Sequence, residues 1–576
     1  MAERRVEIKI TGEKEFVLER NAVASIDPEV CVNCGKCRRI CPTESIAEFQ
    51  RPICRICPDC AKGPMMFRGE SEKFAHEHAC STGCPLGTIP EGYVNLIAEG
   101  KYDLAYDLIA ELNPLPSVCA RICHHPCETD CKRGLLIDKP LDIRGLKRFI
   151  TDRVKPKREK FTARYNTRIA VVGAGPAGIM AAFDLSKKGY KVTVFEAGPK
   201  AGGMMRMGIP DFRLDKDILQ EEIAALEEAG IEIRYNTIVG VNPTIDDLLA
   251  DGFASVLITV GAQKGSRLPI EGADADQVYD AVTFMSRVNS DMPVAIGKKA
   301  IIIGAGSVAV DTARTLLRLG AETATCVCLE SEEDIPAPES EVEEAKEEGV
   351  EFITSASPVK IDAEWVTVAG VLVKKVEKIE RAENGRLTPV LVEGSDFEVE
   401  GDTVVFAVGQ KPDIQNIAGR SGLKLDEAGR LVYDKETFMT SKDKVFVAGD
   451  VVAVRGSVID ALASGRKAAL AIDNMLTGRK LQDRVEHVIS TSDVTDIIYP
   501  VRLEDIAPQR MPKARFRDGF EEVEMGFSEK QAVNEAKRCM KCGYEKVAQE
   551  TCIGCGACVS VCPENAISLV KPAEKE

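Results

Sequence analysis

Cysteine is the residue type with the clearest chemical potential in this sequence. The 576-residue chain has 21 cysteines, of which thirteen lie between Cys31 and Cys131 and six between Cys539 and Cys562. Many are separated by only two or three residues, and close-set thiolates are ligands of iron–sulfur clusters and of zinc. A disulfide scaffold is the alternative, but it fits poorly with a long chain that shows no secretory signal. The pattern therefore predicts metal-cluster chemistry.

Two cysteine runs, residues 31–42 and 552–563, have the spacing C-x2-C-x2-C-x3-C-P of bacterial ferredoxins. Three thiolates of such a run bind three corners of a [4Fe–4S] cubane. The fourth, before proline, binds either the same cluster or a neighbouring one. Zinc sites usually consist of two separated C-x-x-C pairs, so iron–sulfur clusters are the preferred prediction. The eight predicted ligands are Cys31, Cys34, Cys37, Cys41, Cys552, Cys555, Cys558 and Cys562.

Of the other thirteen cysteines, eleven are candidate ligands and two are not. Cys326 and Cys328 lie in a predicted strand, where a buried thiol is the simpler interpretation. The candidates form short groups at C-x-x-C or C-x3-C spacing. They are Cys54, Cys57, Cys60, Cys80, Cys84, Cys119, Cys123, Cys127, Cys131, Cys539 and Cys542.

A strand–glycine–helix–strand pattern over residues 168–196 predicts a nucleotide site. Gly173 permits a tight turn, Gly175 lets the backbone approach a pyrophosphate, and Gly178 lets the helix pack closely on the strand. The helix N-terminus faces the phosphates, and Glu196 ends the second strand, where its carboxylate can bind an adenosine ribose. A glycine turn without a ligand is the weaker interpretation, because all the elements occur in order.

Residues 299–330 repeat this pattern and predict a second dinucleotide site. The residues of its turn are Gly304, Gly306, Ser307 and Ala309. The strand that follows the helix is predicted over residues 325–329 and ends at Glu330. A carboxylate there suits the 2′-hydroxyl of NAD and repels the 2′-phosphate of NADP. NAD(H) is therefore the predicted coenzyme and NADP(H) the less favoured one, the alternative being that Glu330 is solvated and another cation binds NADP.

The chain from about residue 80 to about residue 476 resembles a known family. It includes the small subunit of bacterial glutamate synthase, the N-terminal part of dihydropyrimidine dehydrogenase and the large subunit of NADH-dependent ferredoxin:NADP oxidoreductase. The shared segments are residues 83–85, 113–116, 119–131, 145–149 and 201–214. The resemblance implies an FAD domain with an inserted NAD domain. It also implies that the loop with Gly203, Arg206 and Arg213 wraps FAD and that Gly449 and Asp450 bind its ribityl chain.

The same resemblance implies two [4Fe–4S] clusters with interleaved ligands in the cysteine-rich helical segment. Cys84, Cys123 and Cys127 would bind one, and Cys80 and Cys131 the other. Two departures from the family matter. The C-x-x-C pair that precedes Cys80 in relatives is missing, and Lys147 stands where a Glu or Gln ligand often lies.

Candidate replacements exist for both missing ligand sets. Cys54, Cys57 and Cys60 are candidates to replace the C-x-x-C pair, and Cys119 is the candidate to replace the ligand at Lys147. Cys539 and Cys542 either help to hold a further cluster or are structural. We therefore expect four [4Fe–4S] clusters, or five if the last pair finds two more ligands.

The predicted architecture is an α/β two-dinucleotide-binding-domain flavoprotein with iron–sulfur domains before and after it. The expected domains are a ferredoxin-like region (1–65), a helical cysteine-rich domain (66–160), the first segment of the FAD domain (161–290), an NAD(P) domain (291–403), the second segment of the FAD domain (404–485), a linker and helix with C-x-x-C (486–545), and a C-terminal ferredoxin-like domain (546–576).

The predicted function is electron transfer between NAD(H) and one-electron carriers through FAD and [4Fe–4S] clusters. No Ser-His-Asp set or metal-hydrolase signature is found, so no catalytic side chain is predicted and the chemistry belongs to the cofactors. The net charge of −16 argues against a nucleic-acid partner, and no segment has the length and apolarity of a membrane span. We expect a cytoplasmic subunit of a larger redox complex, with ferredoxin or other Fe–S or flavin subunits as partners. Whether its flavin bifurcates electrons is not encoded in any motif.

Two alternatives to this function remain open. One is a glutamate-synthase-type NAD(P)H reductase subunit that supplies a glutamate-forming partner. The other is a non-catalytic electron-wiring subunit with a degenerate nucleotide site, against which the intact Gly304, Gly306 and Ala309 argue.

Overall fold

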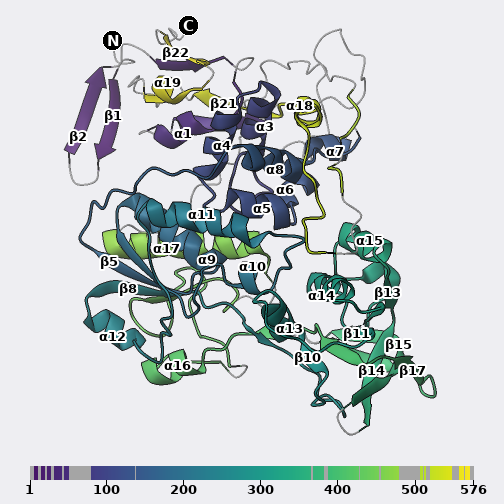
Figure 1. Cartoon of the computed structure of the whole chain (residues 1–576). Helices are drawn as coiled ribbons and strands as arrows, with labels where there is room; N and C mark the ends of the chain where they lie inside the picture. The colour runs from purple at the N-terminus through teal and green to yellow at the C-terminus, as the bar shows by residue number, and fades with distance from the viewer. Residues whose placement is uncertain are drawn as a thin grey trace. The chain divides into compact units, whose positions relative to one another are not determined.

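The chain divides into two compact units in a computed structural model (Figure 1). Unit 1 comprises Met1–Pro156, Gly478–Pro512 and Gly526–Glu576, and unit 2 comprises Lys157–Thr477 and Lys513–Met525. The structure describes residues 5–10, 14–19, 23–27, 31–41, 45–50, 80–136, 138–364, 367–381, 387–426, 429–452, 456–478, 506–509, 511–513, 519–547, 557–563 and 565–570. No helix in these ranges is both long enough and apolar enough to cross a membrane.

The first and last parts of unit 2 in sequence together contain a five-stranded parallel sheet, in the order β20-β8-β5-β6-β7. Its strands are β5 (Arg168–Val172), β6 (Lys191–Phe195), β7 (Glu232–Arg234), β8 (Phe253–Ile258) and β20 (Val445–Val447). The associated helices are α9 (Pro176–Lys188), α10 (Met204–Met207), α11 (Lys216–Glu228), α12 (Ile245–Ala250), α16 (Gln415–Ser421) and α17 (Val458–Thr477). The central strands are mostly apolar because helices cover both faces of a parallel sheet.

The inserted portion of unit 2 has its own five-stranded parallel sheet, in the order β10-β18-β11-β12-β13. Its strands are β10 (Val278–Asp280), β11 (Lys299–Ile303), β12 (Thr323–Val327), β13 (Val350–Ile353) and β18 (Thr403–Phe406), with helices α13 (Ala281–Val288), α14 (Ser307–Arg318) and α15 (Glu339–Glu347). The two parallel sheets confirm the predicted pair of dinucleotide-binding folds.

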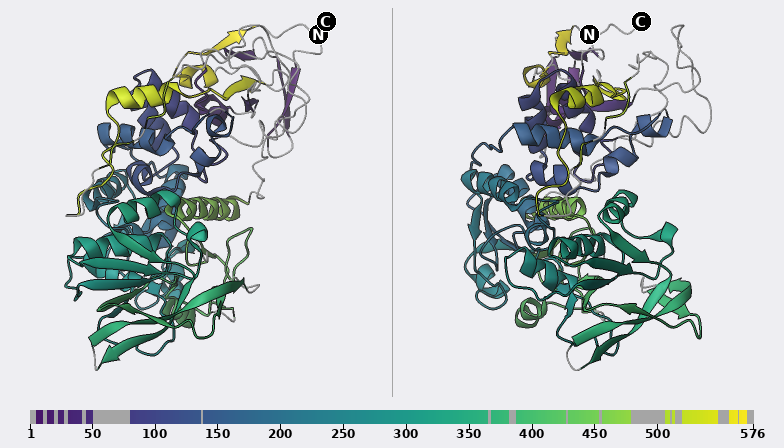
Figure 2. Two further views of the ribbon diagram at one scale, coloured as in Figure 1. Left: turned by 90° about the vertical axis from the view of Figure 1, so that its right-hand side faces the viewer. Right: turned by 45° about the vertical axis from the view of Figure 1, so that its right-hand side comes forward.

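An antiparallel sheet extends the inserted portion (Figure 2, teal and green strands at the bottom). It comprises β14 (Ala356–Glu364), β15 (Thr367–Arg381), β16 (Leu387–Leu391) and β17 (Phe397–Glu400). A two-stranded connection, β9 (Lys264–Gly265) with β19 (Gln410–Lys411), joins the inserted portion to the first sheet. These strands were not among the elements predicted.

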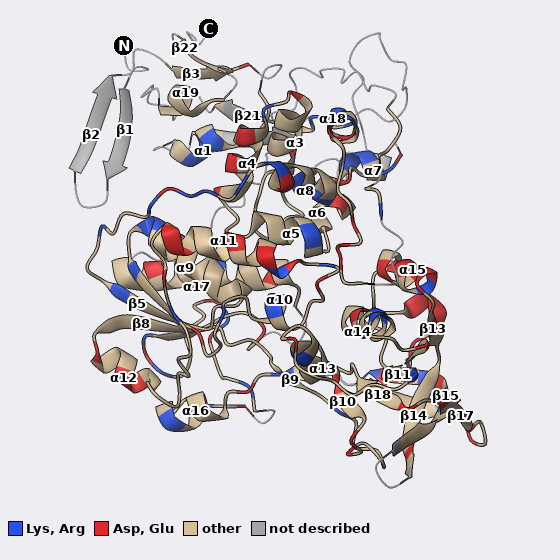
Figure 3. Cartoon of the chain, viewed as in Figure 1, with Lys and Arg blue, Asp and Glu red and all other residues tan. Residues whose placement is uncertain are grey.

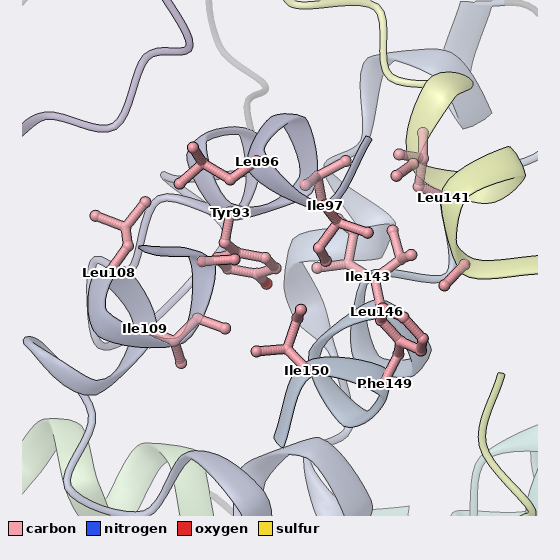
Figure 4. Close-up of a cluster of buried hydrophobic side chains, with 14 of the residues drawn as sticks. Tyr93, Leu96, Ile97, Leu108, Ile109, Leu141, Ile143, Leu146, Phe149 and Ile150 are labelled. Carbon is pink, nitrogen blue, oxygen red and sulfur yellow. The ribbon is translucent and has the colours of Figure 1, made fainter. Parts of the chain in front are cut away.

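Short helices around one apolar core form the middle of unit 1. They are α3 (Pro90–Ala98), α4 (Tyr102–Ala110), α5 (Pro116–Ile122), α6 (Pro126–Thr129), α7 (Lys132–Leu136), α8 (Ile143–Arg153) and α18 (Glu529–Lys537). Figure 4 shows Tyr93 and Ile97 of α3 facing Leu146 and Ile150 of α8. Helix α18 packs against α3 and α8 although it begins 431 residues after α3 ends and 376 residues after α8 ends.

The two ends of the chain form one ferredoxin-type region of unit 1. Strand β3 (Val23–Ile26) pairs antiparallel with β22 (Ile567–Val570), and β4 (Ile46–Gln50) pairs antiparallel with β21 (Gly543–Val547). Helix α1 (Lys36–Ile40) packs against α19 (Ala557–Val561). A separate hairpin, β1 (Arg5–Ile10) with β2 (Lys14–Glu19), precedes them. The two cysteine runs that the sequence shows at opposite ends therefore share sheets and a core.

Candidate cofactor sites

The glycine turn after β5 has the geometry that a pyrophosphate site needs. Gly173 has φ +103°, and a Cβ atom there would lie 2.7 Å from the carbonyl oxygen of Thr259. A Cβ at Gly178 would lie 2.0 Å from the carbonyl oxygen of Gly173, so only glycine lets α9 pack this closely. At Gly175, by contrast, the only atom within 4 Å of a Cβ would be Gly203 Cα, at 3.9 Å. The N-terminus of α9 is thus open on the side where phosphates would bind.

Glu196 lies directly after β6, beside this turn. Its Oε2 accepts a 2.8 Å hydrogen bond from the Ala174 amide, and its Oε1 accepts a 2.8 Å hydrogen bond from the Gly198 amide. These two bonds fix the carboxylate, and each oxygen keeps a lone pair that can accept a ribose hydroxyl. The predicted ribose-binding residue is therefore held at the open end of the turn.

Asp450 and Gly449 follow β20 and precede α17. Burial raises the pKa of the Asp450 carboxyl, and the nearby Asp460 carboxylate raises it further. Among the residues that the structure describes, Asp450 has no hydrogen-bond donor. A partly buried carboxylate of this kind is stabilised by hydroxyl donors, which a ribityl chain supplies. Gly449 has φ +80° and its amide donates to Ser464 Oγ of α17 at 2.9 Å.

Arg206, predicted at the flavin loop, is engaged by its own surroundings. Its Nε donates to the carbonyl oxygen of Ala201 at 2.7 Å and a terminal amine donates to Gln220 Oε1 at 2.9 Å. The guanidinium therefore stiffens the loop that contains Gly203, whose φ is +51°. A direct contact of Arg206 with flavin stays a prediction.

Arg213, the other predicted arginine, binds carboxylates of the inserted portion. It donates to both oxygens of Asp311 on α14 at 2.9 Å and to Glu341 on α15 at 2.7 Å. The neighbouring Phe212 ring lies 4.0 Å from the guanidinium carbon of Arg318. In Figure 3, α14 carries basic residues and α15 carries acidic residues. Arg213 thus fastens the two dinucleotide-binding folds together, and its predicted contact with flavin stays a prediction.

The second glycine turn follows β11 and is open in the same way as the first. Gly304 has φ +123°, and a Cβ there would lie 2.6 Å from the carbonyl oxygen of Ala407. A Cβ at Gly306 would meet no atom within 4 Å. Ser307 is the first residue of α14, and Ala309 is fully buried against the sheet. The N-terminus of α14 is therefore free to receive a phosphate group.

Glu330 lies three residues beyond the end of β12, because the strand ends at Val327 and not at residue 329 as predicted. Its carbonyl oxygen accepts a 2.8 Å hydrogen bond from the Ser355 amide, while its partly exposed carboxylate pairs with no cation among the described residues. Cys326 and Cys328, beside it, are buried, which confirms their interpretation as buried thiols.

The helical region of unit 1 surrounds Lys147 with four cysteines. Burial lowers the pKa of the Lys147 ammonium, but the thiolates of the four raise it above its usual value. They are Cys123, Cys119, Cys84 and Cys127. The predicted replacement ligand, Cys119, therefore lies with the three cysteines that the resemblance assigned to one cluster. The His125 amide donates to Cys123 Sγ at 3.3 Å, a contact that favours a thiolate.

Cys80 and Cys131 do not join that group. They lie beside Cys539 and Cys542, which follow α18. Cys54, Cys57 and Cys60, the other candidates for this place, lie outside the described residues.

The ferredoxin-type region gathers cysteines of both runs into one small core. Cys37, Cys41, Cys558 and Cys562 pack there with Val23 and other apolar residues of the paired strands. Burial raises the pKa of the Cys34 thiol; the Lys36 amide opposes this, and the Cys562 thiolate adds to it. Cys552 and Cys555 lie outside the described ranges.

Backbone amides in both runs point at sulfur. The Asn33 amide donates to Cys31 Sγ at 3.4 Å, the Ser45 amide to Cys41 Sγ at 3.3 Å, and the Ala566 amide to Cys562 Sγ at 3.3 Å. Such donors stabilise the thiolate form that binds iron.

Tyr93 supplies a further test of whether these cysteine groups suit an iron–sulfur cluster. Its side chain is fully buried, and its hydroxyl has no hydrogen-bond partner in the described portion of the chain. Burial raises the pKa of this hydroxyl, and the thiolates of Cys127, Cys84 and Cys80 raise it further. A buried hydroxyl donor without an acceptor costs free energy. A sulfur atom of a bound cluster would supply that acceptor, so the surroundings suit a cluster.

The cysteine groups do not resemble the ligands of a single metal ion. Within the described ranges, no three or more His, Cys, Asp or Glu side chains converge on one point as such ligands do. A [4Fe–4S] cubane does not require that convergence, because each of its four thiolates binds a different iron atom.

Comparison with known families matches each region of the chain separately. The pyridine nucleotide-disulphide oxidoreductase family matches residues 167–469. The family described as dihydropyrimidine dehydrogenase domain II, 4Fe-4S cluster, matches residues 73–159, and the 4Fe-4S binding domain matches residues 24–47 and 545–568.

Three relatives illustrate the range of similar proteins. The NADP(+)-dependent formate dehydrogenase subunit beta of Moorella thermoacetica is 35% identical over 80% of this chain and 70% of its own length. The NAD-dependent dihydropyrimidine dehydrogenase subunit PreT homolog of Salmonella typhi is 35% identical over 70% of this chain and 92% of its own. The glutamate synthase [NADPH] small chain of Escherichia coli K12 is 33% identical over 69% of this chain and 88% of its own. All three are named as subunits or chains of oxidoreductases.

Proposed function

Because this chain belongs to the pyridine nucleotide-disulphide oxidoreductase family, we propose that it passes electrons between NAD(H) and one-electron carriers through FAD and [4Fe–4S] clusters. It is an oxidoreductase with an FAD-binding domain and ferredoxin-type 4Fe-4S domains. The observation that supports the finer proposal is the pair of open glycine turns, at Gly175 and at Gly306, in one unit. When bound, nicotinamide would supply a hydride, flavin would accept two electrons and pass them on singly, and the clusters would carry one electron at a time.

The residues of this chain hold and orient the cofactors in this proposal. Gly173, Gly175 and Gly178 shape the turn for the FAD pyrophosphate, and Glu196 accepts hydrogen bonds from its ribose. Asp450 accepts hydrogen bonds from the ribityl hydroxyls. The cysteine groups hold four clusters in this proposal, and the chain works as a subunit of a larger complex that receives the electrons.

The function is tested by mixing the anaerobically purified chain with NADH. We expect the flavin absorbance to bleach and the electron paramagnetic resonance signals of reduced clusters to appear afterwards. A non-catalytic wiring subunit would leave both unchanged. Gly306→Val should slow flavin reduction by about tenfold, since it fills the phosphate space and removes roughly one hydrogen-bond equivalent of ~1.4 kcal/mol.

The matched control for Gly306→Val is Gly419→Val. Gly419 lies in α16, and a Cβ there would also meet no atom within 4 Å. This control should reduce flavin at the wild-type rate. If Gly306→Val and the control were equally fast, the second turn would not be the nicotinamide site.

We further propose that NADH is preferred over NADPH. Glu330 pairs with no cation among the described residues, and its carboxylate can accept the 2′-hydroxyl of NAD. A charge-assisted hydrogen bond is worth ~1.5–3 kcal/mol, and repulsion of a 2′-phosphate adds to it. The names of the relatives are divided, with NADP in two and NAD in one, so the choice rests on this carboxylate.

Coenzyme choice is measured as the rate of flavin reduction with each coenzyme at equal concentration. The double variant Leu329→Arg with Glu330→Arg should shift the preference towards NADPH. Glu332→Arg is the control, because Glu332 is nearby but pairs with Lys346 at 2.8 Å. Faster reduction of the unmodified chain by NADPH would contradict the role of Glu330.

A glutamate-synthase-type role is the second candidate, favoured by the match to 88% of the length of that small chain. It predicts glutamate formation when the chain is mixed with a suitable amidotransferase partner, whereas the first proposal predicts reduction of ferredoxin. We place the protein in the cytoplasm because its many thiolate ligands require a reducing compartment.

A further inference from the structure

We propose that Cys539 and Cys542 complete a [4Fe–4S] site with Cys80 and Cys131, so that the segment directly after α18 supplies half the ligands of a site in the helical region. This inference rests on the proposal above that the cysteines bind [4Fe–4S] clusters. It assigns the pair that follows α18 to the place where the sequence lacks the expected C-x-x-C pair.

Packing brings the four cysteines together. Cys131 is buried in the core of the helical region, and Cys80 and Cys539 pack against the same core. Cys542 follows Cys539 by three residues and lies close enough to Cys80 for the two thiolates to interact electrostatically. Two ligands thus come from the segment around α3 to α7, and two from the end of α18.

A buried polar network fixes the end of α18 directly before Cys539. Arg538 is fully buried and donates to the carbonyl oxygen of Lys139 at 2.8 Å. Its own carbonyl oxygen accepts a 2.7 Å hydrogen bond from Arg133, two residues after Cys131. The hydrogen bond from the Arg133 side chain to the Arg538 carbonyl oxygen therefore links the segment after Cys131 to the residue before Cys539.

Glu535 anchors the same helix end from the other side. Its buried carboxylate accepts a 3.0 Å hydrogen bond from the Asp142 amide and a 2.7 Å hydrogen bond from the Gln509 amide. Burying charged groups costs free energy unless they are paired, so this network specifies one docked position for α18. The position of Cys539 relative to Cys131 follows from it.

The electrostatics of the site agree with this grouping. Cys80 lies close enough to Cys539, Cys131 and Cys542 to interact electrostatically with all three. Four thiolates held together without compensation repel one another. Iron removes that cost, because each thiol loses its proton when it binds the metal.

The loop that carries the pair repeats the geometry of a ferredoxin run. Lys541 precedes Cys542 and has φ +49°, and Asn33 precedes Cys34 and has φ +52°. A left-handed lysine is uncommon, and such conformations persist where the surrounding structure requires them. The same turn therefore presents both C-x-x-C pairs.

The test compares iron content and cluster signals of full-length variants purified without oxygen. Cys539→Ser and Cys542→Ser should each lose about one quarter of the iron and one set of cluster signals. The double variant Cys80→Ser with Cys539→Ser should lose no more than either single variant, because both residues would bind one cluster. Cys84→Ser with Cys539→Ser should lose about half, because Cys84 lies in the group around Lys147.

FAD content shows whether unit 2, a separate compact unit, is intact in each variant, and the signals of the remaining clusters show whether the rest of unit 1 is folded. Wild-type iron and signals in Cys539→Ser, or additive loss in the Cys80 double variant, would overturn the assignment. If instead the wild-type chain bound no iron at all, the proposed function would fail first. The two failures are therefore distinguishable.

Discussion

At the scale of single residues, Lys147 places a buried positive charge among Cys84, Cys119, Cys123 and Cys127. Reduction adds an electron to a cluster, and a nearby ammonium stabilises the added charge. Lys147 therefore favours the reduced state of the cluster that these thiols would hold.

Replacement of Lys147 by methionine should lower the reduction potential of that cluster. If the reduced cluster loses ~1.4 kcal/mol of stabilisation, the potential of a one-electron couple falls by ~59 mV. The potential is measured by redox titration followed by electron paramagnetic resonance. Lys139→Met, at an exposed position in the same unit, is the control and should leave the potential unchanged. An unaltered potential in Lys147→Met would place the cluster elsewhere.

Replacement of Asp450 by alanine should weaken FAD binding. The lost hydrogen bonds to a charged acceptor are worth ~1.5–3 kcal/mol, or roughly 10- to 150-fold in affinity. Flavin content after gel filtration measures the effect, and iron content should stay at the wild-type level. Asp443→Ala, at an exposed position before β20, is the control. Full flavin content in Asp450→Ala would remove Asp450 from the site.

Residue roles that depend on local sequence could be predicted, and those that depend on distant partners could not. Gly178 is required by a contact with the carbonyl oxygen of Gly173, five residues earlier, so the spacing of the glycines is informative. The partners of Arg213 come from α14 and α15, about 100 residues later, and no local pattern indicates them.

At the scale of elements, the pairing of β3 with β22 and of β4 with β21 joins the two cysteine runs. In two-cluster ferredoxins the fourth cysteine of each run binds the cluster of the other run. The proximity of Cys34 and Cys562 agrees with that exchange.

Cys562→Ser should therefore disturb the cluster of the first run, although Cys562 belongs to the second. The signals that it loses should match those lost in Cys34→Ser, and the double variant should lose no more than either. Cys558→Ser, expected to affect the other cluster, provides the comparison. Loss of the same signals in Cys562→Ser and Cys558→Ser, with those of the first run intact, would contradict the exchange.

The elements with strong local periodicity were predictable from sequence. The apolar strands β5 and β6 and the glycine turn between β5 and α9 follow the expected pattern. Strand β12 ends two residues earlier than predicted, because a run of apolar residues does not show where the sheet partner stops. The antiparallel strands β14 to β17 alternate less regularly and contain register shifts, which obscures their period.

At the scale of the whole molecule, unit 1 is assembled from three separate segments, whereas nearly all of unit 2 is continuous in sequence. Deletion of residues 526–576 removes α18 and the second half of the ferredoxin-type region. It should abolish not only the cluster of the last run but also the cluster of the first run and the site at Cys80.

The truncated chain should therefore keep about one quarter of the iron and its full complement of FAD. Iron and flavin analysis of the monodisperse fraction decides this. Independent domains at the two ends would instead spare the cluster of the first run, and iron would stay near one half. Retention of that larger fraction would contradict the shared ferredoxin-type region.

The division of the ferredoxin-type region between the two chain ends has a consequence for biosynthesis. Residues 31–41 leave the ribosome about 500 residues before α19 does. At ~5–20 residues per second this delay is ~25–100 s. Most of unit 2 is synthesised during that interval, before β21 and β22 exist to pair with β4 and β3. We therefore expect iron insertion at this region to follow synthesis of β21 and β22, so the thiols of the first run need protection from oxidation until then.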